Sequence, residues 1–276
     1  MAFEVTPLTP MIGAEVSGAD LGQLSGAEFA QIEQAFLDHL VLFFRDQDLS
    51  VEQHMAFGQR FGPLHIHPAA NDYRKYAGLP PEILRIHADE NTIWTAGDKW
   101  HTDVSCDPQP PSISILQLET VPPTGGDTLF ANMYAAYEAL SEPMKSMLAG
   151  LTATHDGGPN YRDRAQKAGV DVSQKTYPRA SHPVIRTHPL TGRKTIYVNA
   201  TFTTHIDGIP QDESDALLGF LFNHIAKPNF QCRFKWQRNS VAMWDNRCAL
   251  HHAMWDYYPQ VRSGRRVTVT GDRPFH

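Results

Sequence analysis

Trp100-His101-Thr102-Asp103-Val104-Ser105 places an imidazole and a carboxylate two residues apart, in a run whose alternation is typical of a β-strand. On a strand, residues i and i+2 point to the same face, so His101 and Asp103 would present one nitrogen and one oxygen side by side. A His-x-Asp pair by itself is more often a structural hydrogen-bonded pair than a metal site. A metal centre therefore needs a third ligand from elsewhere in the chain.

A candidate for that ligand lies far downstream, in Trp244-Asp245-Asn246-Arg247-Cys248-Ala249-Leu250-His251-His252. Two histidines and one carboxylate that leave three coordination positions open form the facial triad of non-haem Fe(II) oxygenases. Iron in such a site holds a bidentate co-substrate and dioxygen, which limits the protein to three ligands. His251 and His252 compete for the third ligand because adjacent residues of an extended chain face opposite ways. Composition and spacing leave that choice open.

The overall composition gives no electrostatic reason to propose nucleic acid or an anionic membrane as a partner. The 276 residues include 24 Lys and Arg against 30 Asp and Glu, a net charge of −6. The N-terminus lacks the basic and apolar regions of a signal peptide, and no apolar run approaches the roughly 18 residues of a membrane span. The three scattered cysteines are typical of reduced thiols. We therefore expect a cytoplasmic protein.

Short strand patterns dominate the chain. They are predicted at residues 41–44, 83–86, 113–118, 128–131, 184–187, 195–198, 231–236, 241–244 and 265–270. Helices are predicted after capping boxes at Ser25 and Ser50, in two short pieces between 134 and 150, and over 212–224. The βαβ rhythm of a parallel sheet and a Gly-rich phosphate loop are both absent from the pattern. The sequence predicts a mainly β sandwich or barrel with peripheral helices.

The chain shows no repeat and no break in composition, so we expect a single domain over residues 1–276. Residues 63–100 are long and irregular and precede the candidate ligands, which favours an active-site loop. Residues 156–178 are polar and are predicted to be an insertion.

Four motifs carry a resemblance to a known family: Trp-His-Thr-Asp at 100–103, Gly-Gly-Asp-Thr at 125–128, Trp-Asp-Asn-Arg at 244–247 and Gly-Asp-Arg-Pro-Phe at 271–275. In order and spacing they resemble the taurine branch of the taurine dioxygenase and 2,4-dichlorophenoxyacetate dioxygenase family of Fe(II)/2-oxoglutarate-dependent dioxygenases. The likeness runs nearly from end to end. It implies a double-stranded β-helix, or jelly roll.

The resemblance also implies a set of ligand-binding residues. It places the iron on His101, Asp103 and His251, the last because the family motif is Asn-Arg-x-x-x-His. It makes Thr128 and Arg262 the partners of the distal carboxylate of 2-oxoglutarate. A guanidinium fork binds a carboxylate bidentately, and a hydroxyl adds another hydrogen bond.

On the substrate side, the resemblance implies that Arg266 binds the substrate's anionic group, with His67 and Phe202 lining the pocket. Arg262, Arg266 and Thr268 share parity, so on one strand they face the same side. Arg265 then faces away and is interpreted as a surface charge. The roles of His65 and His252 stay open.

Three positions depart from the taurine pattern. Ala70 replaces a pocket tyrosine, Gly97 an asparagine, and Gly157 a second aromatic wall. All three changes remove bulk or polar contacts on the substrate side. They predict a pocket that is larger or less polar than one built for taurine.

The implied reaction hydroxylates a small anionic organic substrate, with dioxygen and 2-oxoglutarate consumed and succinate and CO2 released. A taurine-like sulfonate would then collapse to sulfite and an aldehyde. Alkylsulfate or aryloxyalkanoate dioxygenases are the alternatives within the family. A zinc hydrolase with the same three ligands is a remote alternative, and a sugar-binding jelly roll leaves Arg262 and Arg266 unexplained. A homo-oligomer, a dimer or tetramer, is expected.

Overall fold

The computed structural model describes residues 3–68, 78–93, 95 and 97–276. Its strands are β1 (Glu4–Pro7), β2 (Ala14–Ser17), β3 (Val41–Phe44), β4 (Leu84–Ala88), β5 (Ile113–Thr120), β6 (Thr128–Asn132), β7 (Thr152–Asp156), β8 (Arg179–Pro183), β9 (Ile185–Thr187), β10 (Lys194–Ile196), β11 (Thr203–Ile206), β12 (Gln231–Phe234), β13 (Ser240–Asp245), β14 (Ala249–Ala253) and β15 (Arg262–Val269). Its helices are α1 (Gly26–His39), α2 (Val51–Gln59), α3 (Met133–Glu138), α4 (Glu142–Leu148), α5 (Gly158–Lys167), α6 (Gln211–Ile225) and the 3-10 turn η2 (Pro228–Phe230). The prediction of a mainly β fold with peripheral helices is confirmed.

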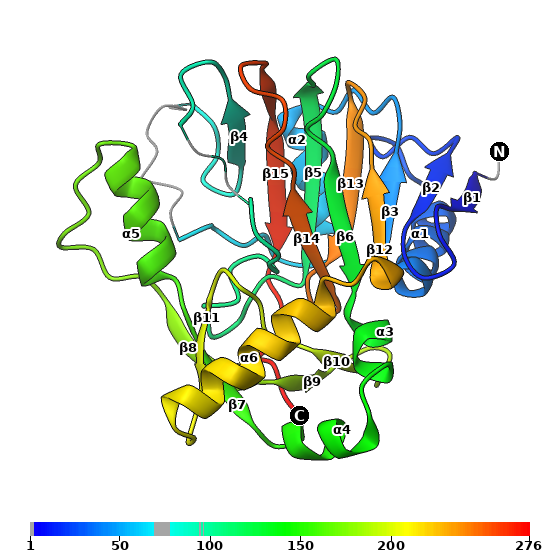
Figure 1. Ribbon diagram of the computed structural model, residues 1–276. Helices are drawn as coiled ribbons and strands as arrows, with labels where there is room; N and C mark the ends of the chain where they lie inside the picture. Colours follow the sequence, from blue (N-terminus) through cyan, green and yellow to red (C-terminus); the bar gives the residue numbers. More distant parts are fainter. Residues whose placement is uncertain (1–2, 69–77, 94, 96) are drawn as a thin grey trace.

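The largest sheet has seven strands in the order β1-β2-β3-β13-β5-β15-β4. A three-stranded sheet, β12-β6-β14, lies in front of it in Figure 1. Aromatic and aliphatic side chains fill the space between these sheets: the Phe43 ring stacks on Phe234 at 3.9 Å and meets Phe130 edge-on at 5.6 Å. The candidate ligands come from this interior.

The other face of the seven-stranded sheet is covered by α1 and α2. The sequence of strand β3, Val41-Leu42-Phe43-Phe44, is apolar at every position because its side chains are buried on both faces of the sheet. Leu42 and Phe44 pack toward the helices, whereas Val41 and Phe43 pack toward the smaller sheet. A strand buried on both faces needs apolar side chains on both parities. Each such side chain contributes about 1.5–3 kcal/mol by burial.

The edge of the seven-stranded sheet contains a feature that the pattern did not predict. Strand β2 pairs with β3 in parallel, and α1 connects them. This is one βαβ unit, so the prediction that such a rhythm is absent is wrong at this edge. The sheet is otherwise antiparallel. Both predicted capping boxes are present, at Ser25 with Glu28 and at Ser50 with Gln53.

The segment predicted as an insertion, residues 156–178, contains helix α5. Figure 1 shows α5 at the left of the molecule, on the side of β4. Its buried residues include Tyr161 and Ala165, which are four residues apart and so lie on one face. This face is turned toward the candidate site.

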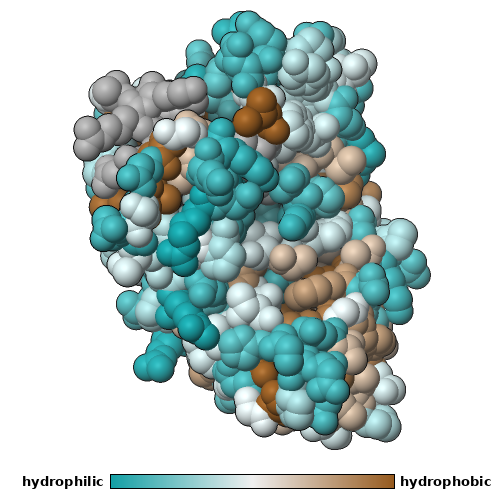
Figure 2. Space-filling view, turned by 60° about the vertical axis from the view of Figure 1, so that its left-hand side comes forward, coloured by the Kyte–Doolittle hydropathy of each residue, from teal (hydrophilic) through white to brown (hydrophobic). Residues whose placement is uncertain are grey.

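Hydrophilic residues cover most of the face that carries α5, and hydrophobic residues form separate groups on it (Figure 2). Exposed large apolar residues are spread along the chain from Leu8 to Phe275. Such scattered residues are normal and need no binding partner to explain them. Among the described residues, no helix has the length and hydropathy of a membrane span.

Candidate active site

His101 and His251 lie opposite each other on an isolated antiparallel bridge. They exchange backbone hydrogen bonds, from the His101 amide to the His251 carbonyl at 3.0 Å and in return at 2.8 Å. His251 belongs to β14, which pairs with β6 in the smaller sheet. The bridge therefore joins the two distant stretches that carry the candidate ligands.

The strand predicted for residues 100–105 ends at His101. Residues 103–106 form a turn in which Val104 has a φ of 49°. A left-handed conformation is rare for a β-branched residue and costs about 1–3 kcal/mol, so it persists because the surroundings impose it. The prediction that a strand pleat aligns the two ligands is wrong; the turn brings the Asp103 carboxylate back toward the His101 ring.

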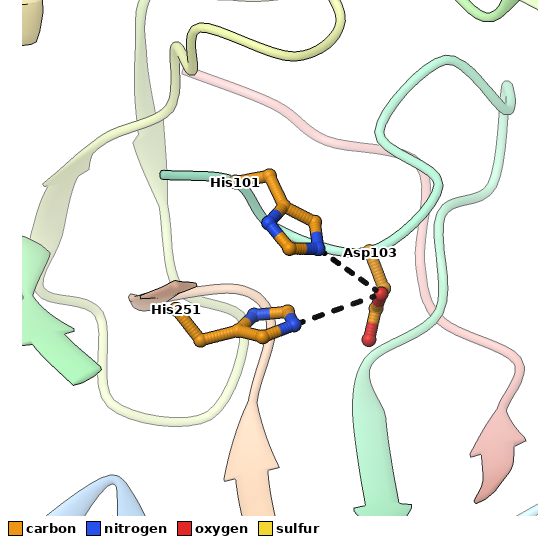
Figure 3. Close-up of side chains that lie close together, drawn as sticks. All are labelled: His101, Asp103 and His251. Atoms are coloured by element: carbon orange, nitrogen blue, oxygen red, sulfur yellow. Dashed lines mark ion pairs between the residues drawn. The ribbon is translucent and has the colours of Figure 1, made fainter. Parts of the chain in front are cut away.

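The three side chains point toward one centre in Figure 3. The Asp103 Oδ1 atom lies 3.8 Å from His101 Nε2 and 3.9 Å from His251 Nε2. Ligand atoms held about 2.1 Å from a metal at right angles are about 3 Å apart. These two distances exceed that value by less than an ångström, and all ligand atoms of the triad lie within 4.8 Å of one another. The donors are the two imidazoles and one carboxylate that suit iron.

The protonation states of these groups suit metal binding. The His101 Nδ1 atom lies 2.8 Å from the Lys99 carbonyl, so it carries the proton and leaves Nε2 as the ligand atom. Burial lowers the pKa of both His101 and His251, which keeps the imidazoles neutral. Burial alone would raise the pKa of Asp103, but the Arg266 guanidinium, together with the Ser114 hydrogen bond, holds it well below its usual range.

The Asp103 carboxylate is oriented by two hydrogen bonds. Ser114 on β5 donates to Oδ2 at 2.6 Å, and Arg266 on β15 donates to Oδ1 at 2.7 Å. The Asn246 side chain connects the site further, because its oxygen accepts from the Asp103 amide and its nitrogen donates to Ser114. Asn246 thus connects the turn at residues 103–106 with the motif at residues 244–247, which precedes His251.

The competition between His251 and His252 is decided by β14. His251 is buried and faces His101, with a ring centroid distance of 4.0 Å. The neighbouring His252 is half-buried and meets the Trp100 ring edge-on at 5.6 Å, on the other side of the strand. His251 is therefore the residue of the pair that can complete the triad.

Arg262 and Thr128 lie together beside the triad. Arg262 is 4 % exposed and donates to the Gly126 carbonyl at 3.0 Å and to Thr128 Oγ1 at 3.4 Å. Trp236 Nε1 donates to the same hydroxyl at 3.0 Å, so the Thr128 proton is left for another acceptor. Burial lowers the pKa of Arg262, and no carboxylate among the described residues forms an ion pair with it. The pair is suited to an anionic ligand.

The parity prediction for β15 is confirmed. Arg262 and Arg266 point into the space between the sheets, whereas Arg265 donates to the Leu49 carbonyl on the opposite side. The interpretation of Arg265 as a surface charge is wrong. Its side chain is 11 % exposed and lies 2.7 Å from Glu119 as an ion pair.

The family comparison adds an independent observation to this geometry. Residues 4–269 match the family model "Taurine catabolism dioxygenase TauD, TfdA family". The chain belongs to this family. The predicted resemblance is confirmed, and with it the enzyme class, a 2-oxoglutarate-dependent dioxygenase.

Named relatives and a solved structure agree with this TauD/TfdA assignment. An alpha-ketoglutarate-dependent sulfonate dioxygenase of Saccharomyces cerevisiae is 32% identical over 281 residues, covering 99% of this chain and 68% of the relative. A 2,4-dichlorophenoxyacetate dioxygenase of Cupriavidus pinatubonensis is 33% identical, covering 99% of both chains. A taurine dioxygenase structure from Burkholderia xenovorans has a TM-score of 0.84 at 38% identity, covering 99% of this chain and 93% of that one.

Aromatic residues form one side of the site in this TauD/TfdA family member. Phe202 is buried in a cluster with Val104, Cys106 and Tyr161. The His67 ring meets the Tyr161 ring edge-on at 5.5 Å. Burial, and then the Arg266 charge, lower the pKa of His67 to about 3, so its ring is neutral. The structure therefore brings His67, Phe202 and Arg266 to the same side of the triad.

The open question of His65 is answered by its contacts. Its Nε2 atom lies 3.5 Å from Asp107, and its amide donates to the Thr268 carbonyl. It fixes the loop to β15. The predicted departure at Ala70 lies outside the described residues.

The pocket is not enlarged at the other two departures. A Cβ atom on Gly97 would lie 3.0 Å from the His101 ring, and one on Gly157 would lie 2.7 Å from the Tyr161 ring. Neither glycine faces open space. Neighbouring rings occupy the room at these two positions, and the prediction of a larger or less polar pocket stays a prediction.

A second cluster with the composition of a metal site consists of His188, Asp245 and Cys248. Its hydrogen bonds are already used internally. His188 Nδ1 accepts from two backbone amides while Nε2 donates to Asp245, and Arg247 forms a bidentate pair with the same carboxylate. Burial raises the pKa of Cys248, which disfavours the thiolate. We interpret this cluster as structural.

Two residues of the site were missed by sequence reasoning. Ser114 had a detectable signal, because it is a polar residue within the apolar run Ile113-Ser114-Ile115, on the parity that faces the interior. Tyr161 had none, because it lies in a polar segment where no strand or helix was predicted.

Proposed function

We propose that this protein hydroxylates a small anionic organic substrate, and that the substrate is a taurine-like sulfonate. The observation that carries the proposal is the buried Arg262 guanidinium, which lies with the Thr128 hydroxyl and forms no ion pair among the described residues. The Asp127 charge acts on Arg262, but that carboxylate is ion-paired with Arg233. The distal carboxylate of 2-oxoglutarate would give the buried guanidinium a direct counter-ion.

His101, Asp103 and His251 would hold Fe(II), which together with 2-oxoglutarate and dioxygen supplies the oxidising power. The task of the chain is then to bind, orient and exclude water. Ser114 keeps the Asp103 carboxylate in place. Arg266 would bind the substrate's sulfonate, while Phe202 and His67 line the side from which its carbon approaches.

The overall reaction balances as sulfonate, 2-oxoglutarate and dioxygen giving aldehyde, sulfite, succinate and CO2. The substrate carbon bonded to sulfur gains a hydroxyl, and the carbon–sulfur bond then breaks with loss of sulfite. An aryloxyalkanoate substrate is the second candidate, since a 33% identical relative is named for 2,4-dichlorophenoxyacetate. An alkyl sulfate is the third, because it carries the same anionic SO3 end.

Several structural predictions belong with this proposal. The two facing sheets would be the two halves of a double-stranded β-helix, and residues 1–276 would form one domain with an active-site loop at 63–100 and an insertion at 156–178. A homo-oligomer and a cytoplasmic location stay predictions.

The test follows dioxygen uptake and succinate formation with Fe(II), 2-oxoglutarate and taurine, hexyl sulfate or 2,4-dichlorophenoxyacetate. We expect one of these compounds to accelerate both signals together, with sulfite released from taurine. A protein that consumes no dioxygen with any compound, but hydrolyses esters when loaded with Zn(II), would be the zinc hydrolase instead.

A further inference from the structure

The further inference concerns Tyr161 on α5, and it rests on the proposed function. At Gly157, where the family pattern has an aromatic wall, a Cβ atom would lie 2.7 Å from the Tyr161 ring and 2.9 Å from the Cys106 sulfur. The ring of Tyr161 therefore occupies the space that a side chain at 157 would need. Tyr161, one helical turn after residue 157, therefore provides the aromatic wall, and its ring carries a hydroxyl.

The position of the Tyr161 ring is set by contacts on several sides. Its centroid lies 5.5 Å from that of His67, 5.9 Å from that of Phe202 and 5.0 Å from that of Tyr177. Val104, which follows the candidate ligand Asp103, belongs to the same cluster. The ring is thus part of the lining on the substrate side of the triad.

The Tyr161 phenol is buried, with 1% of the residue exposed, and the Cys106 thiol is the one hydrogen-bonding group that meets its oxygen among the described residues. A buried hydroxyl without a partner is destabilising, so such a group needs an explanation. The Cys106 thiol lies beside it, but a thiol is a weak partner. Both oxygens of Asp103 already accept hydrogen bonds, from Arg266 and Ser114.

The charges near the phenol favour an anionic acceptor. Burial raises the pKa of Tyr161 well above its ordinary value, so the phenol keeps its proton and can donate it. The positive charges of Arg164 and Arg266 act on the phenol, and so does the negative charge of Asp103, which forms an ion pair with Arg266. Arg164 lies three residues after Tyr161, on the same side of α5. A negatively charged group placed here would meet donors from α5 and β15.

We propose that Tyr161 is a specificity-determining residue whose phenol donates a hydrogen bond to an oxygen of the substrate's anionic group, beside the Arg266 guanidinium. A sulfonate or sulfate ester has three terminal oxygens arranged in three directions. Two can accept the guanidinium fork while the third accepts from the phenol. A carboxylate has four lone-pair positions, all in the plane of its two oxygens, so once the fork uses two of them no acceptor points out of that plane as the third SO3 oxygen does. Tyr161 therefore selects SO3 groups over carboxylates.

The experiment compares wild type with Tyr161→Phe, which keeps the ring and removes the hydroxyl. The protein is loaded with Mn(II) and N-oxalylglycine, which do not turn over, and calorimetry measures the Kd of taurine, hexyl sulfate and 2,4-dichlorophenoxyacetate. We expect the variant to weaken binding of the sulfonate or sulfate roughly 10- to 100-fold. Binding of the carboxylate should change less than about threefold, and that of N-oxalylglycine should not change.

Tyr134→Phe is the matched control, because it removes another buried phenol, one that is bonded to Thr191 and lies outside the site. It should leave every Kd unchanged. If wild type binds hexyl sulfate or taurine and Tyr161→Phe binds it equally well, the inference is overturned while the proposed function stands. If wild type prefers the carboxylate, selection of SO3 by Tyr161 is overturned. If no compound couples to dioxygen use in wild type, the proposed function itself fails.

Discussion

The neighbouring histidines His251 and His252 differ in role, because only His251 belongs to the triad. His251 faces His101 across the bridge, whereas His252 packs on Trp100. Replacing His251 by Ala should therefore abolish the visible band of the anaerobic Fe(II)–2-oxoglutarate complex and weaken metal binding at least about 100-fold. His252→Ala is the control and should retain the band. Equal loss in both variants would contradict the assignment.

The arginines of β15 offer a second residue-level comparison. Arg262 has no carboxylate partner among the described residues, whereas Arg265 is paired with Glu119 on the other face. Arg262→Gln should raise the KM for 2-oxoglutarate roughly 10- to 100-fold, because a bidentate charged hydrogen bond is lost. Arg265→Gln should leave that KM unchanged and lower stability instead. Initial rates of succinate formation and thermal unfolding of both variants measure the two effects.

At the scale of local elements, the turn that contains Gly97 restricts the position of the His101 ring. Gly97 has a φ of 85°, and its carbonyl accepts from the Ala253 amide at 2.8 Å. Gly97→Ala would add backbone strain of about 1–3 kcal/mol and press on the His101 ring, which lies 3.0 Å from the new Cβ. We expect lower stability and weaker Fe(II) binding.

Gly208→Ala separates these two effects, because Gly208 has a φ of 79° and a Cβ atom added there would meet no other atom within 4 Å. Gly208→Ala should lower the free energy of unfolding by an amount similar to Gly97→Ala but leave Fe(II) binding unchanged. Metal titrations that show the same loss for both variants would mean that contact with His101 is unimportant.

Sequence patterns predicted the elements whose cause is local. The capping boxes at Ser25 and Ser50 and the shared parity of Arg262 and Arg266 on β15 depend on neighbouring residues, and all are present. The parallel pairing of β2 with β3 depends on contacts across the sheet, so no local pattern indicated it. The turn at Val104 was hidden because strand-forming residues adopt it under tertiary constraint. The complete triad was predicted through the family motif Asn-Arg-x-x-x-His, because composition and spacing left His251 and His252 as alternatives.

At the scale of the whole molecule, buried neutral histidines make stability depend on pH. His54 on α2 is fully buried and donates from Nε2 to the Ile115 carbonyl at 3.1 Å. Burial, together with the charge of Arg265, lowers its pKa from 6.5 to about 4. Between these values the unfolded chain binds a proton that the folded chain does not. Stability therefore falls as the pH drops below 6.5 and levels off near 4.

His54→Leu should remove this contribution. Between pH 7 and pH 5, the free energy of unfolding of wild type should fall by about 2 kcal/mol more than that of the variant. Urea denaturation at several pH values measures the two slopes. The comparison concerns slopes alone, so a uniform loss of stability in the variant does not affect it, whereas parallel slopes would refute the prediction.

The spacing of Arg262 and Arg266 on β15 has a consequence for inhibition. They are four positions apart in the sequence, so their Cα atoms are at most about 13 Å apart, and both side chains enter the same interior space. In the proposed reaction each guanidinium receives a different small anion. One molecule with an anionic group at each end, and a linker short enough to fit between the arginines, would occupy both positions at once. Such a compound would compete with 2-oxoglutarate and with the substrate together.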